Sequence, residues 1–323
     1  MIIVTGGAGF IGSAFVWKLN SEGIDDILIV DELGDTEKWK NLVNRRYVDY
    51  MHKEDFLDRI ASSQGMADVR AIIHMGACSS TTERDADYLM ENNYHYTCRI
   101  AERALLKKVR FIYASSAATY GDGTQGFSDD DAVTPTLRPI NMYGYSKQLF
   151  DLWLLRRRAE QQCAGIKFFN VFGPNEYHKG DMTSVIFKAF HQINKAGKVR
   201  LFKSYNPEYG DGEQRRDFVY VKDCVNVLWW LLEHPDANGI FNLGTGQSQT
   251  WNDLIKAVFS AMNLEPRIEY FDMPQEIRDQ YQYFTEAKMG KLRDTGCPSI
   301  FNPLEETVRD YVVNHLQKSY PYL

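Results

Sequence analysis

Cysteine and histidine are scarce in this sequence, with five and seven copies among 323 residues. The cysteine count is odd, and neither residue type has the spacing of a metal site or a redox motif. We therefore expect reduced thiols, no metal and a cytoplasmic location. No apolar run is long enough to cross a bilayer, and the first residues read as a strand, so we expect neither a membrane anchor nor a signal peptide.

The chain also lacks an excess of positive charge, because 37 Lys and Arg stand against 43 Asp and Glu. The formal net charge of -6 argues against general affinity for nucleic acid. An anionic small molecule would need a local basic cluster. What the sequence does contain is 44% hydrophobic and 25% charged residues, an ordinary globular composition with enough apolar side chains for a full core.

Short apolar segments alternate with segments of helical spacing through the first two thirds of the chain. Strands are predicted at 2–5, 27–30, 70–74, 109–115 and 166–171, and helices at 13–20, 86–106 and 143–159. This alternation predicts an α/β fold with a doubly wound parallel (Rossmann) sheet, which binds ligands at the carboxyl ends of its strands. We assign 1–172 to a dinucleotide-binding domain and 173–323 mainly to a smaller α/β substrate lobe, parts of which fold back onto the sheet.

A glycine-rich turn joins the first predicted strand to the first predicted helix. Its glycines are Gly6, Gly9 and Gly12, which allow a tight turn and a close approach of backbone amides to a pyrophosphate at a helix N-terminus. Asp31 follows at the end of the second strand, where an acidic residue binds the adenosine ribose. These features predict a nicotinamide-dependent enzyme.

The choice between NAD and NADP depends on the charges near Asp31. Its carboxylate repels a 2′-phosphate and by itself favours NAD. Lys38 and Lys53 lie downstream and would offset that repulsion. Lys40 is interpreted as a surface charge.

The predicted chemistry rests on Tyr143 and Lys147, whose spacing of four places them on one face of a helix. A nearby ammonium lowers the pKa of a phenol, so that Tyr143 is expected to exchange a proton with a substrate hydroxyl. Ser116 follows the strand at 109–115 and would hydrogen-bond the same oxygen. Together with the glycine loop, this set resembles the short-chain dehydrogenases/reductases in their extended form, over essentially the whole chain.

More specific motifs narrow the resemblance. The segments at 74–82 (HMGACSSTT), 114–121 (ASSAATYG), 141–147 (NMYGYSK), 169–174 (FNVFGP), 178–182 (HKGDM) and 216–221 (RDFVYV) are similar to those of the ADP-L-glycero-D-manno-heptose 6-epimerases. That family uses NADP to invert C6 of an ADP-linked heptose, whose product feeds the lipopolysaccharide inner core. The resemblance implies NADP as cofactor, with NAD as the alternative, an ADP-heptose substrate and a homo-oligomer, commonly a pentamer.

The resemblance also implies roles for individual residues. Ser116, Tyr143 and Lys147 match the catalytic serine, tyrosine and lysine, and Lys179 matches a second acid/base group. Cofactor contacts are expected at Gly6, Gly9, Phe10, Ile11, Gly12, Asp31, Glu32, Lys38, Lys53, Met75, Gly76, Ala77, Cys78, Ser79, Asn92, Tyr143, Lys147, Val171 and Lys179. Substrate contacts are expected at Ser116, Asn170, Lys179, Asp181, Lys188, Phe202, Lys203, Ser204, Tyr205, Arg216 and Tyr281.

The sequence departs from the family pattern at three of these positions. Glu32 replaces an uncharged Asn, which weakens the case for NADP. Asp181 and Lys188 replace a Ser and a His, so their substrate contacts are open. The loop at 204–216 is longer than is usual.

Three alternatives remain at this stage. A nucleotide-sugar 4,6-dehydratase would carry an Asp-Glu pair after the catalytic hydroxyl, where this chain has Ala117 and Ala118. A nucleotide-sugar 4-epimerase lacks the stretch around Lys179. A non-catalytic cofactor-binding protein usually loses the tyrosine or the lysine of the pair Tyr143 and Lys147, and this chain keeps both.

Overall fold

Seven strands, most of them fully buried, run parallel in the main sheet. They are β1 (Ile2–Thr5), β2 (Ile27–Asp31), β3 (Asp49–His52), β4 (Ala71–His74), β5 (Arg110–Ser116), β6 (Cys163–Phe168) and β11 (Gly239–Leu243). Their order is β11-β6-β5-β4-β1-β2-β3. The structure is a computed structural model that describes residues 1–62, 64–278 and 281–323.

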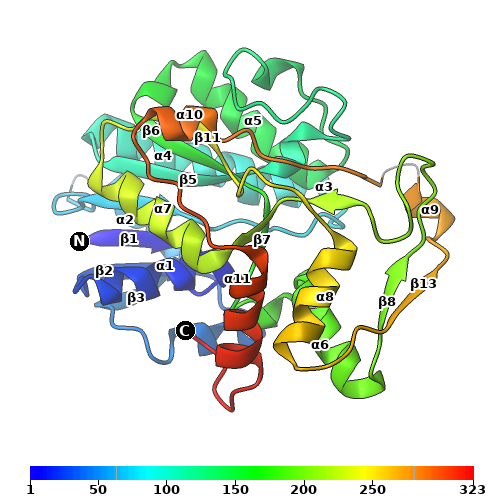
Figure 1. Ribbon diagram of the computed structural model, residues 1–323. Coiled ribbons are helices and arrows are strands. Elements are labelled where there is room, and N and C mark those ends of the chain that lie inside the picture. Colours follow the sequence, from blue (N-terminus) through cyan, green and yellow to red (C-terminus); the bar gives the residue numbers. More distant parts are fainter. Residues whose placement is uncertain (63, 279–280) are drawn as a thin grey trace.

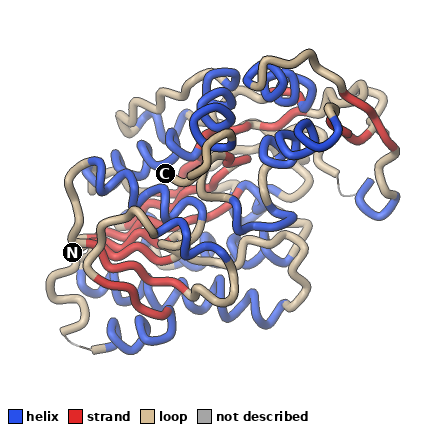
Figure 2. The backbone as a smooth tube through the Cα atoms, turned by 90° about the horizontal axis from the view of Figure 1, so that it is seen from below, coloured by secondary structure: helices blue, strands red, loops and turns tan. Residues whose placement is uncertain are grey.

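Helices cover both faces of this sheet, as Figure 2 shows. The helices α2 (Lys53–Ala61), α4 (Tyr96–Lys107) and α5 (Met142–Arg156) pack on one face, and α1 (Phe10–Ser21) and α7 (Val221–Glu233) pack on the other. The apolar side chains of the strands point alternately to the two faces and form two separate cores. The predicted doubly wound parallel sheet is thus confirmed.

The strand order reverses at β1, which lies between β2 and β4. The loops that follow β1 and β4 therefore diverge to opposite faces and leave a crevice at the carboxyl edge of the sheet. The two loops touch at one point: a Cβ added to Gly6 would lie 2.6 Å from the backbone nitrogen of Gly76. Gly6 also has a φ of 63°, which favours glycine.

A smaller lobe, here called the C-terminal lobe, lies beyond the carboxyl ends of the strands (Figure 1). It contains α6 (Val185–Ala196), β8 (Val199–Phe202), α8 (Trp251–Ala261), β13 (Ile268–Phe271) and α9 (Gln275–Arg278). Two further strand pairs, β7 (Asn170–Phe172) with β10 (Phe218–Tyr220) and β9 (Arg215–Arg216) with β12 (Gln249–Thr250), lie between this lobe and the sheet. The other α-helices of the described residues are α3 (Ala86–Leu89), α10 (Gly290–Asp294) and α11 (Leu304–Tyr311). The late strand β11 pairs with β6, so the chain returns to the main sheet after residue 172.

Two predicted elements are divided in the structure, and two further elements were missed. The strand predicted at 166–171 is two strands, because the amide of Phe169 donates to Leu243 and the chain turns before β7 begins. The helix predicted at 86–106 is interrupted by a π-helical stretch, Met90–His95, in which Asn93 turns inward and bonds both backbone groups of Cys78. The short strand β3 and helix α2 were missed.

The described residues contain no helix that is both long and apolar enough to span a membrane. All five cysteines carry free thiols, and four of them are buried.

Candidate active site

A cleft of ≈ 1150 Å³ opens between the carboxyl edge of the sheet and the C-terminal lobe. It brings together residues from both ends of the chain, from Gly6 to Thr285. The predicted site residues that line it are Gly6, Gly9, Phe10, Ile11, Gly12, Asp31, Lys38, Met75, Gly76, Ala77, Cys78, Ser79, Ser116, Tyr143, Lys147, Asn170, Val171, Lys179, Arg216 and Tyr281.

The glycine loop has the shape that a dinucleotide needs. Helix α1 begins at Phe10 without a capping side chain, so its first turn faces the cleft with its positive end uncovered. A Cβ at Gly12 would overlap the carbonyl oxygen of Gly6, whereas a Cβ at Gly9 would meet that oxygen at 3.1 Å and otherwise enter open space. The loop and helix thus fit a pyrophosphate.

Beside the loop, Asp31 is held by three groups at the end of β2. The amides of Ala8 and Glu32 donate to its carboxylate at 2.9 and 2.8 Å, and Lys38 forms an ion pair with it at 2.7 Å. Because Lys38 neutralises Asp31, the carboxylate does not stand as a free negative charge at the cleft wall.

A second ion pair, between Lys53 and Glu32, lies next to the ion pair of Lys38 with Asp31. Lys53 contacts Glu32 at 2.5 Å and donates to Asn92 at 2.9 Å, and this contact lowers the pKa of Glu32. These three residues are not among those that line the cleft.

The predicted catalytic trio comes together over the end of β5. Asn141 caps helix α5 by accepting from the amide of Gly144 at 2.8 Å, which fixes Tyr143 in the first turn. A Cβ at Gly144 would lie 2.6 Å from the carbonyl oxygen of Ala118, so the lack of a side chain lets the helix approach the turn that follows Ser116. The Ser116 hydroxyl and the Tyr143 phenol are neighbours as a result.

Burial dominates the proton affinities of this trio. It raises the pKa of Tyr143, although the Ser116 hydroxyl acts in the opposite direction. It lowers the pKa of Lys147 to about 8. In the protein alone the net pKa of Tyr143 is thus raised and not lowered as expected, while the Lys147 ammonium donates to the carbonyl oxygen of Ala114 at 2.8 Å. Tyr143 is a neutral phenol at rest and is suited to donate a proton.

Lys179 reaches the same cleft from another direction. It lies in a short 3-10 segment, Tyr177–Met182, and its ammonium lies 5.3 Å from the centre of the Phe10 ring. Burial lowers the pKa of Lys179, and the buried carboxylate of Glu176 raises it. No acceptor for this ammonium is found in the described part of the chain.

Arg216 enters the cleft from the lobe side, between the rings of Tyr281 and Trp251 at 5.3 and 5.7 Å. Burial lowers the pKa of this guanidinium. It donates hydrogen bonds to the carbonyl oxygens of Arg215 and Gln282, and no carboxylate pairs with it in residues 1–62, 64–278 and 281–323. A buried cation of this kind favours an anionic ligand.

Sequence reasoning missed Trp251, whose ring nitrogen donates to the Tyr281 hydroxyl at 3.1 Å. A tryptophan at the first position of a helix is usually interpreted as a core residue, and only the fold places Trp251 in the cleft. Conversely, several predicted substrate contacts lie outside the cleft lining and stay predictions: Asp181, Lys188, Phe202, Lys203, Ser204 and Tyr205. Lys188 is bonded to the carbonyl oxygen of Asp181, and Lys203 and Tyr205 contact Asp272.

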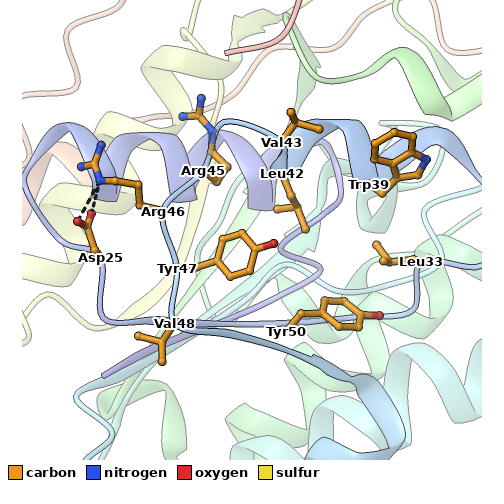
Figure 3. Close-up of a pocket in the computed structure, with 10 residues that line it drawn as sticks. All are labelled: Asp25, Leu33, Trp39, Leu42, Val43, Arg45, Arg46, Tyr47, Val48 and Tyr50. Carbon is orange, nitrogen blue, oxygen red and sulfur yellow. Dashed lines mark hydrogen bonds and ion pairs between the residues drawn. The ribbon is translucent and has the colours of Figure 1, made fainter.

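A second hollow of ≈ 820 Å³ lies beside β2 and the segment Glu37–Leu42 (Figure 3). Its lining includes Trp39, Leu42, Tyr47 and Tyr50, with one ion pair between Arg46 and Asp25 at its edge. It contains none of the predicted site residues, so the chemistry is assigned to the cleft.

A doubly wound sheet with a glycine loop at its reversal point and a Ser–Tyr–Lys cluster over the next strand end defines a short-chain dehydrogenase-like enzyme that uses a nicotinamide dinucleotide. Comparison with known proteins agrees. The chain belongs to the NAD dependent epimerase/dehydratase family, whose model matches residues 2–244.

Its curated relatives carry a more specific name. The chain is 61% identical, over the full length of both, to an ADP-L-glycero-D-manno-heptose-6-epimerase of Nitratidesulfovibrio vulgaris, and 48% identical, again over both full lengths, to one of Fusobacterium nucleatum. The crystal structure of the Helicobacter pylori ADP-L-glycero-D-manno-heptose-6-epimerase has the same fold, with a TM-score of 0.81 and 24% identity over 97% of this chain and 95% of that one. The predicted family resemblance is confirmed.

Proposed function

We propose that this chain is an ADP-L-glycero-D-manno-heptose 6-epimerase. It would convert ADP-D-glycero-D-manno-heptose into its L-glycero epimer through a 6-keto intermediate. The observation that carries the proposal is the presence of two proton carriers from different elements in one cleft: Tyr143 over the end of β5 and Lys179 beside the glycine loop. The names of the full-length relatives support the choice of substrate.

Two carriers suit the inversion of a secondary alcohol. A bound nicotinamide would supply hydride removal from C6 and hydride return to the same carbon. Inversion would require the sugar to present the opposite face of C6 for the return, and its oxygen would then lie at a new position. Tyr143, with Ser116 as hydrogen-bond partner, would move the proton in one orientation, and Lys179 would do so in the other. The lowered pKa of Lys179 makes its ammonium a better proton donor than an exposed lysine.

NADP is the proposed cofactor. A 2′-phosphate beside the adenosine ribose would meet Lys38 in the cleft lining, and Lys53 would add positive charge next to the lining, so that the two ammonium groups offset Asp31 and Glu32. The four charges cancel, so the preference over NAD rests on how the phosphate competes with two carboxylates for two ammonium groups. Equal or tighter binding of NAD by calorimetry would remove NADP from the proposal.

Arg216 is the proposed clamp for the sugar's diphosphate. Its guanidinium is buried between two rings and hydrogen-bonds carbonyl oxygens, so its positive charge is available to a phosphate. The Tyr281 hydroxyl, positioned by Trp251, would contact the sugar or the nucleotide next to it.

The proposal also includes the wider organisation of the enzyme. We assign 1–172 to dinucleotide binding and 173–323 mainly to the substrate, with β11 as a later segment that completes the sheet. A cytoplasmic homo-oligomer is part of the same proposal.

The test begins with the bound nucleotide. The purified protein is denatured, and the released nucleotide is identified and quantified. ADP-D-glycero-D-manno-heptose, UDP-galactose and dTDP-glucose are then assayed side by side for epimerisation and for water elimination. We expect NADP and C6 inversion of the ADP-heptose alone. Faster turnover of UDP-galactose or dTDP-glucose would replace the proposal by a 4-epimerase or a dehydratase.

A further inference from the structure

Three consecutive residues of β5 face three successive turns of α5. The carbonyl oxygen of Ala114 accepts from Lys147 at 2.8 Å, and the Ser115 hydroxyl donates to Asp151 at 2.8 Å. Ser116, the next residue, is the neighbour of Tyr143. Since Tyr143, Lys147 and Asp151 are spaced by four, they form one row along the helix, and Asp151 is its buried end.

Asp151 accepts three hydrogen bonds in this position. Tyr113 donates to one carboxylate oxygen at 2.9 Å, while Ser115 and Lys167 donate to the other at 2.8 and 2.7 Å. Lys167 stands opposite Ser115 in the register of β6 against β5. Both members of the Asp151–Lys167 ion pair have a side-chain exposure of 0%.

A second arm of the network reaches the catalytic serine. Lys167 also donates to the Thr119 hydroxyl at 2.8 Å, and Thr119 donates to the backbone carbonyl oxygen of Ser116 at 2.8 Å. The network therefore fixes β5, β6, α5 and the turn after Ser116 relative to one another.

Stability alone does not explain such a pair. Removing two charges from water costs more than their attraction returns unless the geometry is very good, and apolar residues of similar volume often stabilise a fold equally well. Asp151 follows Lys147 by one helical turn in the same row, so its carboxylate is placed to act on the charge of Lys147.

We infer that Asp151 is a positioning residue that keeps the ammonium of Lys147 charged and, through its own bonds to β5 and β6, holds α5 and hence Lys147 in place, and that Lys167 stabilises Asp151 in that role. The inference rests on the proposed function for its activity readout. Asp151 touches neither the substrate nor the cofactor, and it acts through Lys147.

The charged groups around Lys147 determine how each substitution changes the pKa of Lys147. Asp151 on α5 and Cys78 after β4 raise the pKa of Lys147 against the effect of burial. His74 on β4 has its pKa lowered to about 3 and is uncharged above that pH, and Tyr143 is a neutral phenol. Lys167 on β6 faces Asp151. Loss of the Asp151 carboxylate should therefore let Lys147 lose its proton at a lower pH.

The experiment compares Asp151→Asn, Lys167→Met and the double variant Asp151→Asn/Lys167→Met with the wild-type holoenzyme. Turnover of ADP-D-glycero-D-manno-heptose at saturation is measured from pH 6 to pH 10, and thermal unfolding is measured in parallel. Lys222→Met is the matched control, because it breaks an ion pair with Asp310 on the opposite face of the sheet and should leave the pH profile unchanged.

We expect the pH of the alkaline limb to depend on whether the Asp151 carboxylate is present. We expect Tm to depend on whether either member of the Asp151–Lys167 pair is left buried without its partner. Asp151→Asn should move the limb down by about one pH unit and lower Tm, because it leaves Lys167 buried without its partner. The double variant should recover most of the lost Tm but keep the lowered limb. Lys167→Met should lose Tm and lower the limb no further than Asp151→Asn does, because it weakens the Asp151 carboxylate but does not remove it.

A purely structural pair would give another result. An unmoved limb in the double variant, or a limb that falls further in Lys167→Met than in Asp151→Asn, overturns the inference. If the wild type epimerises no nucleotide sugar, the proposed function fails, and the same variants are compared by calorimetry of NADP binding at pH 7 and pH 9. Affinity at pH 9 that falls more steeply in Asp151→Asn than in Lys222→Met supports the role of Asp151, and equal pH dependence in both contradicts it.

Discussion

The ammonium nitrogen of Lys179 lies 5.3 Å from the centre of the Phe10 ring, beside the first turn of α1. One cation thus stands at the boundary between the proposed pyrophosphate site and the proposed sugar site. Glu176 lies three residues earlier, and its buried carboxylate accepts from Ser184 and Tyr311, which fixes the segment that carries Lys179. This position allows two roles, proton transfer and phosphate binding, and kinetics separates them.

The glycine loop gives the first prediction. Gly9→Val should abolish dinucleotide binding without unfolding the protein, because the backbone of Gly9 has an ordinary φ of -72° and the added methyl groups would enter the cleft. Nucleotide content per protomer after purification measures the effect. Gly290→Val is the control, since a Cβ there meets nothing within 4 Å. Wild-type occupancy in Gly9→Val would disprove the assignment of this loop.

Tyr143→Phe gives the second prediction. The ring is kept and only the hydroxyl is lost, so the fold and dinucleotide binding should persist. Turnover of the ADP-heptose should fall by about 10² to 10⁴, the usual contribution of a positioned acid or base. Steady-state kinetics at saturating substrate checks this, with circular dichroism as the control for folding. Near-normal turnover would remove Tyr143 from the mechanism.

The third prediction concerns His74, which is buried at the end of β4 between the hydroxyls of Thr5 and Thr97 at 2.6 and 2.8 Å. Burial lowers its pKa from 6.5 to about 3. Between these values the unfolded chain binds a proton that the folded protein excludes, so stability falls as the pH decreases from 6.5 towards 3. From pH 6.5 to pH 5 the loss should be about 2 kcal/mol.

Urea unfolding at the two pH values measures that loss. His178, whose pKa is lowered to about 4, contributes in the same direction, so the decisive quantity is the difference between the wild type and His74→Gln. The variant should lose about 2 kcal/mol less over this range. An equal loss in both proteins would show that His74 is not the group excluded from protonation.

The sequence predicts the parts of this site that are marked by local patterns, and it misses the parts that depend on partners distant in the chain. The glycine loop and the Tyr143–Lys147 spacing are local patterns, and both lie where they were expected. The strand β3 was missed because Asp49–His52 has no fully buried residue and hence no apolar run. Trp251 and Lys167 were missed for another reason: their roles depend on partners that are distant in the chain, Tyr281 for one and Asp151 for the other.

The last prediction separates the two roles of Lys179. If Tyr143 and Lys179 act on opposite faces of one ketone, either should support half of the chemistry alone. An aldehyde analogue of the sugar tests this, because one molecule can be oxidised while another is reduced, and such dismutation never requires both epimers of a secondary alcohol. Lys179→Met should therefore lose most of the epimerase activity but keep substantial dismutase activity. Lys195→Met, which removes an exposed lysine at the end of α6, is the control.

A lysine that only anchored the diphosphate would behave differently. Its loss should weaken binding of every ADP-sugar, which raises KM and leaves kcat largely intact. The dismutase activity would then suffer as much as the epimerase activity at subsaturating substrate, and both would recover at saturation. Normal kcat of Lys179→Met on saturating ADP-heptose would therefore withdraw the second acid/base role and leave Lys179 as a binding residue beside Phe10.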